Sequence, residues 1–132
     1  MNRQTRIGLA GLVTVAAALV GGAAAPRALL PALGGLWEVS QRADGHGAER
    51  ICVPSPVMLA QYEHRTGRCT RSVIRDNGSQ AEISYTCTDG GFGQSKVTLL
   101  TPRTMRIETQ GISGNQPFHY QLHARRVGDC GR

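Results

Sequence analysis

The sequence has few aromatic residues and no close-set cysteines. Only one Trp, three Tyr and two Phe occur in 132 residues, which leaves little bulk for both a core and a ligand cavity. The four cysteines are 17, 18 and 43 positions apart (69 − 52, 87 − 69, 130 − 87), unlike the paired cysteines of zinc sites and thioredoxin-type motifs. After residue 20, no apolar run reaches the ~20 residues that a membrane-spanning helix needs.

The N-terminus has the form of a secretory signal peptide. Two arginines precede an uncharged apolar stretch at 7–20, and an alanine cluster follows at 23–25. Because signal peptidase does not accept proline directly after the cut, Pro26 favours cleavage after Ala24 or Ala23. The alternative is an uncleaved anchor, for which the run is short. We therefore predict a signal peptide at 1–24, a single disulfide-stabilised β domain at 25–132, and a periplasmic or secreted protein with no membrane span after cleavage.

The predicted mature chain is basic. Removing Arg3 and Arg6 leaves 15 − 2 = 13 basic against 9 acidic residues, and Lys96 is the sole lysine. Such a charge favours anionic partners, and we expect another envelope protein or an anionic lipid. No basic stretch is interleaved with aromatic residues, so the sequence pattern argues against nucleic acid as a binding partner.

A β-hairpin is predicted at 65–89. Asn77-Gly78 is a strong hairpin signal, and each arm carries one cysteine at a similar distance from it. A two-residue Asn77-Gly78 loop places Cys69 and Cys87 on opposite faces and excludes a bridge. A three-residue loop at 76–78 puts them on one face a diagonal step apart, and one at 77–79 opposes them directly.

Two disulfides are predicted from the even number of cysteines in a small exported chain, with three possible connectivities. We favour a same-face hairpin register, which pairs Cys69 with Cys87 and leaves Cys52 to pair with Cys130. Cys52 points away from its apolar neighbours Ile51 and Val53, so its bridge is expected on a rim or outer face.

The fold class is predicted to be mainly β. Alternating apolar and polar residues indicate strands at 35–42, 48–53, 94–100, 104–110 and 118–126, in addition to the two arms of the hairpin. Ser55 and Pro56 favour one short helix at 57–64. We expect a single antiparallel meander of about seven strands, curved into a half barrel or a small barrel.

Few residues suggest catalysis. His119 and His123 would bind one metal from a helix, but on a strand they lie about 13 Å apart. No Gly-x-Ser-x-Gly elbow occurs, and the loop at 90–93 precedes no helix that would bind phosphate. We therefore predict no catalytic residue, no cofactor and no metal. A hydrolase using His119 or His123 with a carboxylate from a neighbouring strand is the less favoured alternative.

Two families share motifs with this chain. Gly35-Leu-Trp37 with Arg125 and Arg126 resembles the Gly-x-Trp and packed arginine of lipocalin-like barrels. A fuller resemblance, from Leu33 to Cys130, is to the small exported bacterial proteins grouped as domain of unknown function 3617. The motifs that carry it are Gly35-Leu-Trp-Glu-Val39, Ile51-Cys-Val53 before Pro54, the two hairpin cysteines and the ending Ala124-Arg-Arg-Val-Gly-Asp-Cys130. This resemblance implies an envelope location and four paired cysteines, with no established activity.

The expected function is a non-catalytic interaction or binding module. Trp37, Tyr85, Phe118 and Tyr120 lie on inward faces of predicted strands, where they either fill a core or face a ligand. In the second case the protein carries a small apolar or lipid-like molecule in a lipocalin-like barrel. The scarcity of aromatics favours the filled core, with the sheet edges and the arginine-rich outer face left for a partner.

Overall fold

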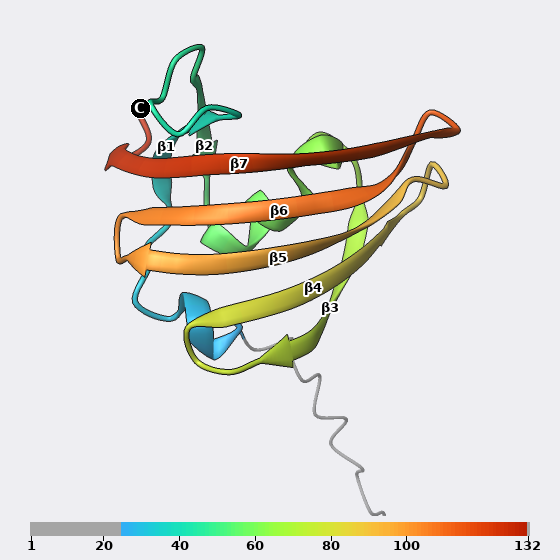
Figure 1. The fold of residues 1–132 in the computed structure, drawn as a ribbon, viewed down its shortest axis with the longest axis horizontal. Coiled ribbons are helices and arrows are strands. Elements are labelled where there is room, and N and C mark those ends of the chain that lie inside the picture. The colour runs from blue at the N-terminus through green and yellow to red at the C-terminus, as the bar shows by residue number, and fades with distance from the viewer. Residues whose placement is uncertain (1–24, 132) are drawn as a thin grey trace, which may run out of the picture.

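The structure, a computed structural model, describes residues 25–131, and the predicted signal peptide lies outside them. Seven strands and two 3₁₀ helices make up the fold (Figure 1). The strands are β1 (Gly35–Ser40), β2 (Glu49–Val53), β3 (Cys69–Asp76), β4 (Gln80–Cys87), β5 (Phe92–Thr101), β6 (Thr104–Ser113) and β7 (Gln116–Gly128). The helices are η1 (Arg27–Leu29) and η2 (Pro56–His64).

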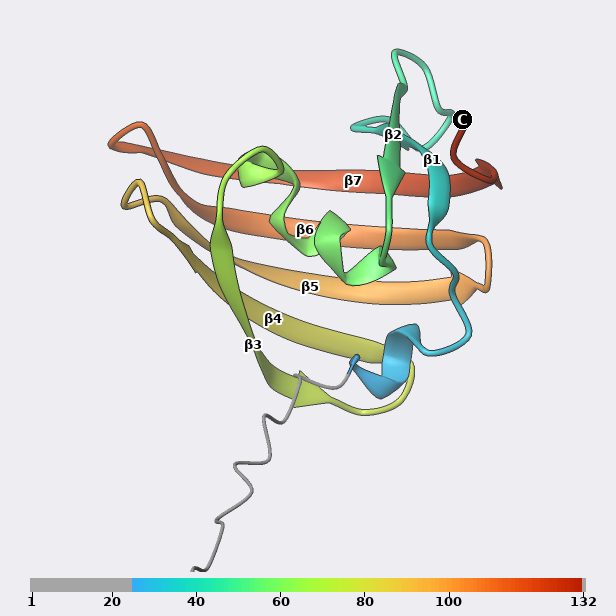
Figure 2. The same ribbon diagram turned by 180° about the vertical axis from the view of Figure 1, so that it is seen from behind.

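All strands form one antiparallel sheet in the order β2-β1-β7-β6-β5-β4-β3. The chain runs from β3 to β7 as a meander, and the β1–β2 hairpin joins the sheet beside β7. The sheet curves around η1 and η2 but does not close, so β2 and β3 are its two edges (Figures 1 and 2). The predicted mainly β meander is confirmed, in the open form of a half barrel.

The β3–β4 hairpin contains a β-bulge, which determines the register of Cys69 against Cys87. Asn77 donates its backbone N–H to the carbonyl of Gln80 at 3.1 Å, so the loop itself is Gly78-Ser79, and Gly78 has a φ of 90°. A shift between Val73 and Arg75 then brings Cys69 directly opposite Cys87. The three-residue loop at 77–79 was expected to give this opposition. The structure reaches it with a shorter loop and one extra residue in β3, a device that sequence alternation alone does not indicate.

The core lies between the concave face of the sheet and the two 3₁₀ helices. Trp37, Ala81, Ile83 and Ile107 are each 0% exposed. Val39, Leu59, Val97, Met105, Leu122 and Ala124 complete the apolar packing around them. In β1, β4, β5 and β6 the alternation therefore directs one set of side chains into the core, as predicted, whereas β3 has no fully buried residue.

The helix predicted at 57–64 is present as the 3₁₀ helix η2, and Gln61 interrupts it with φ −107° and ψ 32°. Ser55 occupies the N-cap position but makes no side-chain cap hydrogen bond. Leu59 and Ala60 are buried, each 1% exposed, whereas Val57, Met58 and Tyr62 are only partly buried. Leu59 and Ala60 therefore make the buried contacts of η2, and Val57, Met58 and Tyr62 pack against the core while partly exposed.

The segment before β1 packs on the core as η1. Asp76 at the end of β3 accepts hydrogen bonds from the backbone N–H groups of Arg27 and Ala28. Ala28 and Leu29 are 1% and 3% exposed, so this turn covers the end of the concave face.

Candidate functional site

The outer edge of β3 carries backbone groups directed away from the sheet. Thr88 N–H donates to the carbonyl of Arg68 at 3.0 Å, which makes this pair a hydrogen-bonded one. Hydrogen-bonded and non-hydrogen-bonded pairs alternate along an antiparallel ladder. Cys69, Arg71 and Val73 therefore point their N–H and C=O groups away from β4. We refer to these outward backbone groups as the β3 edge.

Both ends of the β3 edge are closed by local structure. At one end η1 covers the strand, where the Arg27 guanidinium donates to the Asp76 carbonyl at 3.0 Å. At the other end the chain turns away, with Gly67 N–H donating to the His64 carbonyl at 2.9 Å. The accessible stretch is therefore short and centred on Arg71 and Val73.

A groove of ≈ 720 Å³ runs beside the β3 edge on its concave side. Val73 and the neighbouring Ile74 are 44% and 53% exposed, although both are large apolar residues. The groove lies between the residues just before η1, the start of η2, β3 and β4, and its walls are mostly apolar. Its lining comprises Ala25, Pro26, Ser55, Val57, Met58, Thr70, Arg71, Ser72, Val73 and Ile83.

Three arginines give this edge a positive charge. The Arg71 guanidinium donates a hydrogen bond to the side-chain oxygen of the buried Gln61. This bond holds the aliphatic part of the Arg71 side chain across the groove. Arg75 lies 3.9 Å from Glu82 and is 81% exposed, so this ion pair is weak. In the described part of the chain, no carboxylate forms a salt bridge with Arg68 or Arg71. The edge is therefore basic as well as apolar.

A buried histidine and tyrosine pair lies close to the start of β3, since Tyr85 on β4 is paired with Arg71. His64 Nδ1 lies 3.0 Å from the Tyr85 hydroxyl, and the two rings meet edge-on with centroids 5.4 Å apart. The Phe118 ring is 5.8 Å from His64 and 5.7 Å from Tyr120. His64 Nε2 has no hydrogen-bond partner among residues 25–131. It faces Gly91, where an added Cβ would lie only 2.3 Å away.

The phenols in this region are unsuited to act as bases. Burial and then the nearby Glu63 carboxylate raise the pKa of Tyr85 to about 12. Tyr120 donates to Glu63 Oε2 at 2.6 Å, and burial followed by this carboxylate raises its pKa further above the ordinary tyrosine value. Both hydroxyls therefore stay protonated, and that of Tyr120 serves as a hydrogen-bond donor to Glu63.

Of the four aromatic residues predicted to be core or ligand-facing, Tyr85, Phe118 and Tyr120 gather near His64. Trp37 lies on β1, is fully buried and donates its indole N–H to the Leu33 carbonyl at 3.2 Å. Tyr85 is 1% exposed, while Phe118 and Tyr120 are partly exposed. Trp37 and Tyr85 are therefore buried, Tyr120 packs against the core, and Phe118 lines a surface pocket with Phe92.

The cysteines form two pairs at disulfide distance. Cys69 is joined to Cys87 across β3 and β4, and Cys52 on β2 is joined to Cys130 after β7. Cys52 is exposed on the face opposite to Val53, so this bridge lies on the outer side of the sheet. The second bridge ties the C-terminal segment to the β2 edge.

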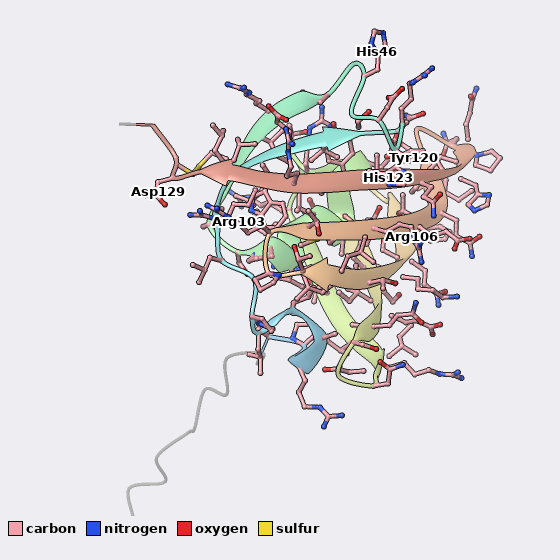
Figure 3. All side chains as sticks on the ribbon, turned by 60° about the vertical axis from the view of Figure 1, so that its left-hand side comes forward. His46, Arg103, Arg106, Tyr120, His123 and Asp129 are labelled. Carbon is pink, nitrogen blue, oxygen red and sulfur yellow. A yellow bond between two sulfur atoms is a disulfide. The ribbon has the colours of Figure 1, made fainter. Side chains whose placement is uncertain are left out.

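The outer-face histidines lie apart from the interior cluster. His119 Nε2 is 3.5 Å from Glu108 Oε1, and the two side chains are 64% and 53% exposed. In residues 25–131 His119 makes no hydrogen bond to a serine, threonine or cysteine side chain, and no cluster of three potential metal ligands occurs. His123 lies on β7, and His46 lies at the tip of the loop between β1 and β2 (Figure 3).

Sequence reasoning missed several buried polar residues. Gln61, Ser95 and Thr109 are 2%, 0% and 1% exposed. The Ser95 hydroxyl donates to the Ala60 carbonyl, and its oxygen lies 2.8 Å from Thr109 Oγ1. Alternation is the signal that could have found two of them, because Ser95 shares the inner face with Val97 and Thr109 with Ile107. The burial of His64 and Gln61 depends on the path of η2 across the sheet, which no local pattern indicates.

Together, the fold and the site define a small, disulfide-linked half barrel with a packed interior and one open, basic sheet edge. The chain belongs to the family described as "Protein of unknown function (DUF3617)", whose model matches residues 29–130. No curated protein and no solved structure matches the chain. None of the described helices is long and apolar enough to cross a membrane.

Proposed function

We propose that the protein is an exported, non-catalytic interaction module that binds an extended segment of another envelope protein at the β3 edge. The observation that carries this proposal is the unpaired β3 edge beside an apolar groove of ≈ 720 Å³. In strand addition, main-chain hydrogen bonds supply affinity and pockets for alternate side chains supply specificity. The outward backbone groups of Arg71 and Val73 are available for these main-chain hydrogen bonds, and the groove can accept the side chains of the added strand.

The charge of the edge favours an acidic segment. A strand laid along β3 would lie beside Arg68, Arg71 and Arg75, of which only Arg75 has a carboxylate nearby in the described residues. The same arginines oppose pairing with a second copy of this basic strand, because like charges on neighbouring strands are destabilising. Natural sheet edges use charges and bulges in this way to limit self-association. We therefore expect a partner segment that alternates apolar and acidic residues.

The packed interior argues against the two alternatives. A lipocalin-like cavity would be lined by residues such as Trp37, Ile83 and Ile107. Each of these is 0% exposed, and all three belong to one continuous core. An enzyme would require a positioned acid, base or nucleophile. The closest arrangement, His119 with Glu108, is more than half exposed on the outer face.

Export is supported by the leader-like N-terminus and the disulfides. Two structural disulfides in a small domain indicate an oxidising compartment such as the periplasm. We expect cleavage after Ala24 or Ala23, and mass spectrometry of the protein recovered from its host would define the new N-terminus. An intact Met1 in a membrane fraction would contradict export as a cleaved protein.

A photo-crosslinking amino acid at position 74 tests the binding site in the host envelope. Ile74 is 53% exposed beside the β3 edge, and Phe92, 48% exposed on β5, provides a matched control position. We expect a discrete cross-linked product from position 74 and not from position 92.

Two substitutions at Val73 then separate the backbone from the side chain. Val73→Pro removes an outward N–H without breaking the β4 ladder, whereas Val73→Ala removes only side-chain atoms. The product should disappear in Val73→Pro and persist in Val73→Ala, with both variants shown to be folded by circular dichroism. Equal cross-linking in Val73→Pro and the parent would contradict strand addition.

A further inference from the structure

A second exposed apolar feature lies at one end of the half barrel, away from the accessible part of the β3 edge. Leu30, Leu33, Leu100 and Val127 are 64%, 65%, 57% and 37% exposed. They come from three segments: the η1–β1 connection, the end of β5 and the end of β7. We call this group the leucine end. Figures 1 and 2 show these three segments at the same end of the sheet.

Arg126 holds the three segments together. Its guanidinium Nε donates to the Gly34 carbonyl at 3.0 Å, and its backbone N–H donates to the Arg103 carbonyl at 2.8 Å. The Arg126 side chain is only 11% exposed and also reaches Asp129 at 2.6 Å. Leu33 is further fixed because its carbonyl accepts the Trp37 indole N–H. The backbone under the exposed leucines is therefore anchored while the side chains project outward.

Basic groups accompany the leucines. Arg103 lies in the turn between β5 and β6, close to the end of β7 and on the same side of the molecule as Asp129 (Figure 3). Arg27 on η1 is exposed and lies in the segment that leads to Leu30 and Leu33. Asp76 is engaged by the N–H groups of η1 and Asp129 by Arg126. Glu38 and Asp44 line a pocket with Leu100, and Glu38 is paired with Arg50 and Arg125, and Asp44 with Arg42.

We propose that the leucine end docks the protein on an anionic lipid surface. Three leucines and a valine projecting from three segments, with arginines beside them, match the interface of a bilayer, where apolar side chains enter the acyl boundary and arginines meet anionic headgroups. The charge of the surroundings favours this occupant over a neutral apolar protein surface. Docking by this end leaves the middle of the β3 edge accessible to its own partner, so the two interactions are independent.

Vesicle flotation tests the proposal with protein recovered from the host envelope and a defined N-terminus. We expect binding to vesicles of phosphatidylglycerol and phosphatidylethanolamine, weaker binding at high salt, and little binding to phosphatidylcholine alone. Leu33→Ser and Leu100→Ser should each lower the partition coefficient about tenfold, the loss expected for an apolar side chain of this size. Arg103→Gln should lower it about fivefold, the contribution of one basic residue near an anionic surface.

Phe92→Ser is the matched control, because Phe92 is 48% exposed but lies on β5 away from the leucine end. It should leave the partition coefficient unchanged. If Leu33→Ser proves unstable in thermal melts, Leu100→Ser alone decides the outcome. Failure to float with anionic vesicles would overturn the proposal, as would an equal loss in Phe92→Ser. A stable dimer that is abolished by Leu100→Ser would show instead that a second copy covers this end.

Discussion

Tyr85 is the residue on which the interior polar cluster depends. Its hydroxyl lies 3.0 Å from His64 Nδ1, in a region where both side chains are buried. A buried polar group that loses its partner costs about 1–3 kcal/mol, because water cannot replace the lost hydrogen bond.

Tyr85→Phe should therefore lower the free energy of unfolding by about 1–3 kcal/mol. Tyr62→Phe is a useful comparison, because the Tyr62 hydroxyl donates to Glu49 at a site open to water. A smaller loss of unfolding free energy is expected there. Urea unfolding followed by circular dichroism measures both. Equal losses in the two variants would mean that the His64 contact contributes nothing particular to stability.

Glu38 should make stability depend on pH. Hydrogen bonds from Arg125 and then Arg50 lower the pKa of its carboxyl below the ordinary value of 4.5. A carboxyl with a lowered pKa in the folded state stabilises the fold above its unfolded pKa, and this contribution is lost as the pH falls through the folded value.

Glu38→Gln should therefore reduce stability at pH 7, and the difference from the parent should vanish in acid, below the folded pKa of Glu38. Urea unfolding across this pH range provides the measurement. Gln94→Ala, a neutral change on the same outer face, should keep the pH dependence of the parent. A difference in Glu38→Gln that persists unchanged at low pH would contradict the assigned role of these ion pairs.

At the scale of elements, the sequence predicted the strands well because each alternates over several residues. The turn between β3 and β4 was also indicated, by Asn77-Gly78. The bulge in β3 was not, since one inserted residue near a turn leaves the alternation on either side intact. η1 was not predicted from the sequence. Its fold depends on Asp76, which lies about 50 residues later and offers no local signal.

The two disulfides should contribute different amounts to the stability of the fold. Their sequence separations are 18 and 78 residues, for which loop-closure entropy gives about 3 and about 4.5 kcal/mol. We expect paired Cys→Ala substitutions at 52 and 130 to lower stability more than those at 69 and 87. Thermal unfolding of the two double variants gives the order. The reverse order would contradict a dominant effect on the unfolded chain.

At the scale of the whole molecule, the two sheet edges are unequal. β2 has only five residues, carries Glu49 and Arg50, and is tied to the C-terminal segment by the Cys52–Cys130 bridge. Short, charged and covered strands are the usual means of blocking an edge. β3 has eight residues and presents Val73 and Ile74 to solvent. The fold thus leaves one principal edge for strand addition.

The filled interior yields a prediction for the intact protein. With Trp37, Ile83 and Ile107 fully buried in one continuous core, no carrier cavity is expected within the half barrel. Native mass spectrometry of protein recovered from the envelope, followed by organic extraction, should give the mass of the polypeptide alone. A stoichiometric lipid bound after purification would support the carrier alternative instead.

Amide hydrogen exchange at β3 tests the central claim most directly. In the free protein, the outward amides of Arg71 and Val73 should exchange faster than those of Thr70 and Ser72, which face β4. A synthetic peptide of alternating valine and glutamate should slow exchange at Arg71 and Val73, while the same peptide with N-methylated backbone amides should not. Protection by both peptides alike, or protection that spares Arg71 and Val73, would contradict strand addition at this edge.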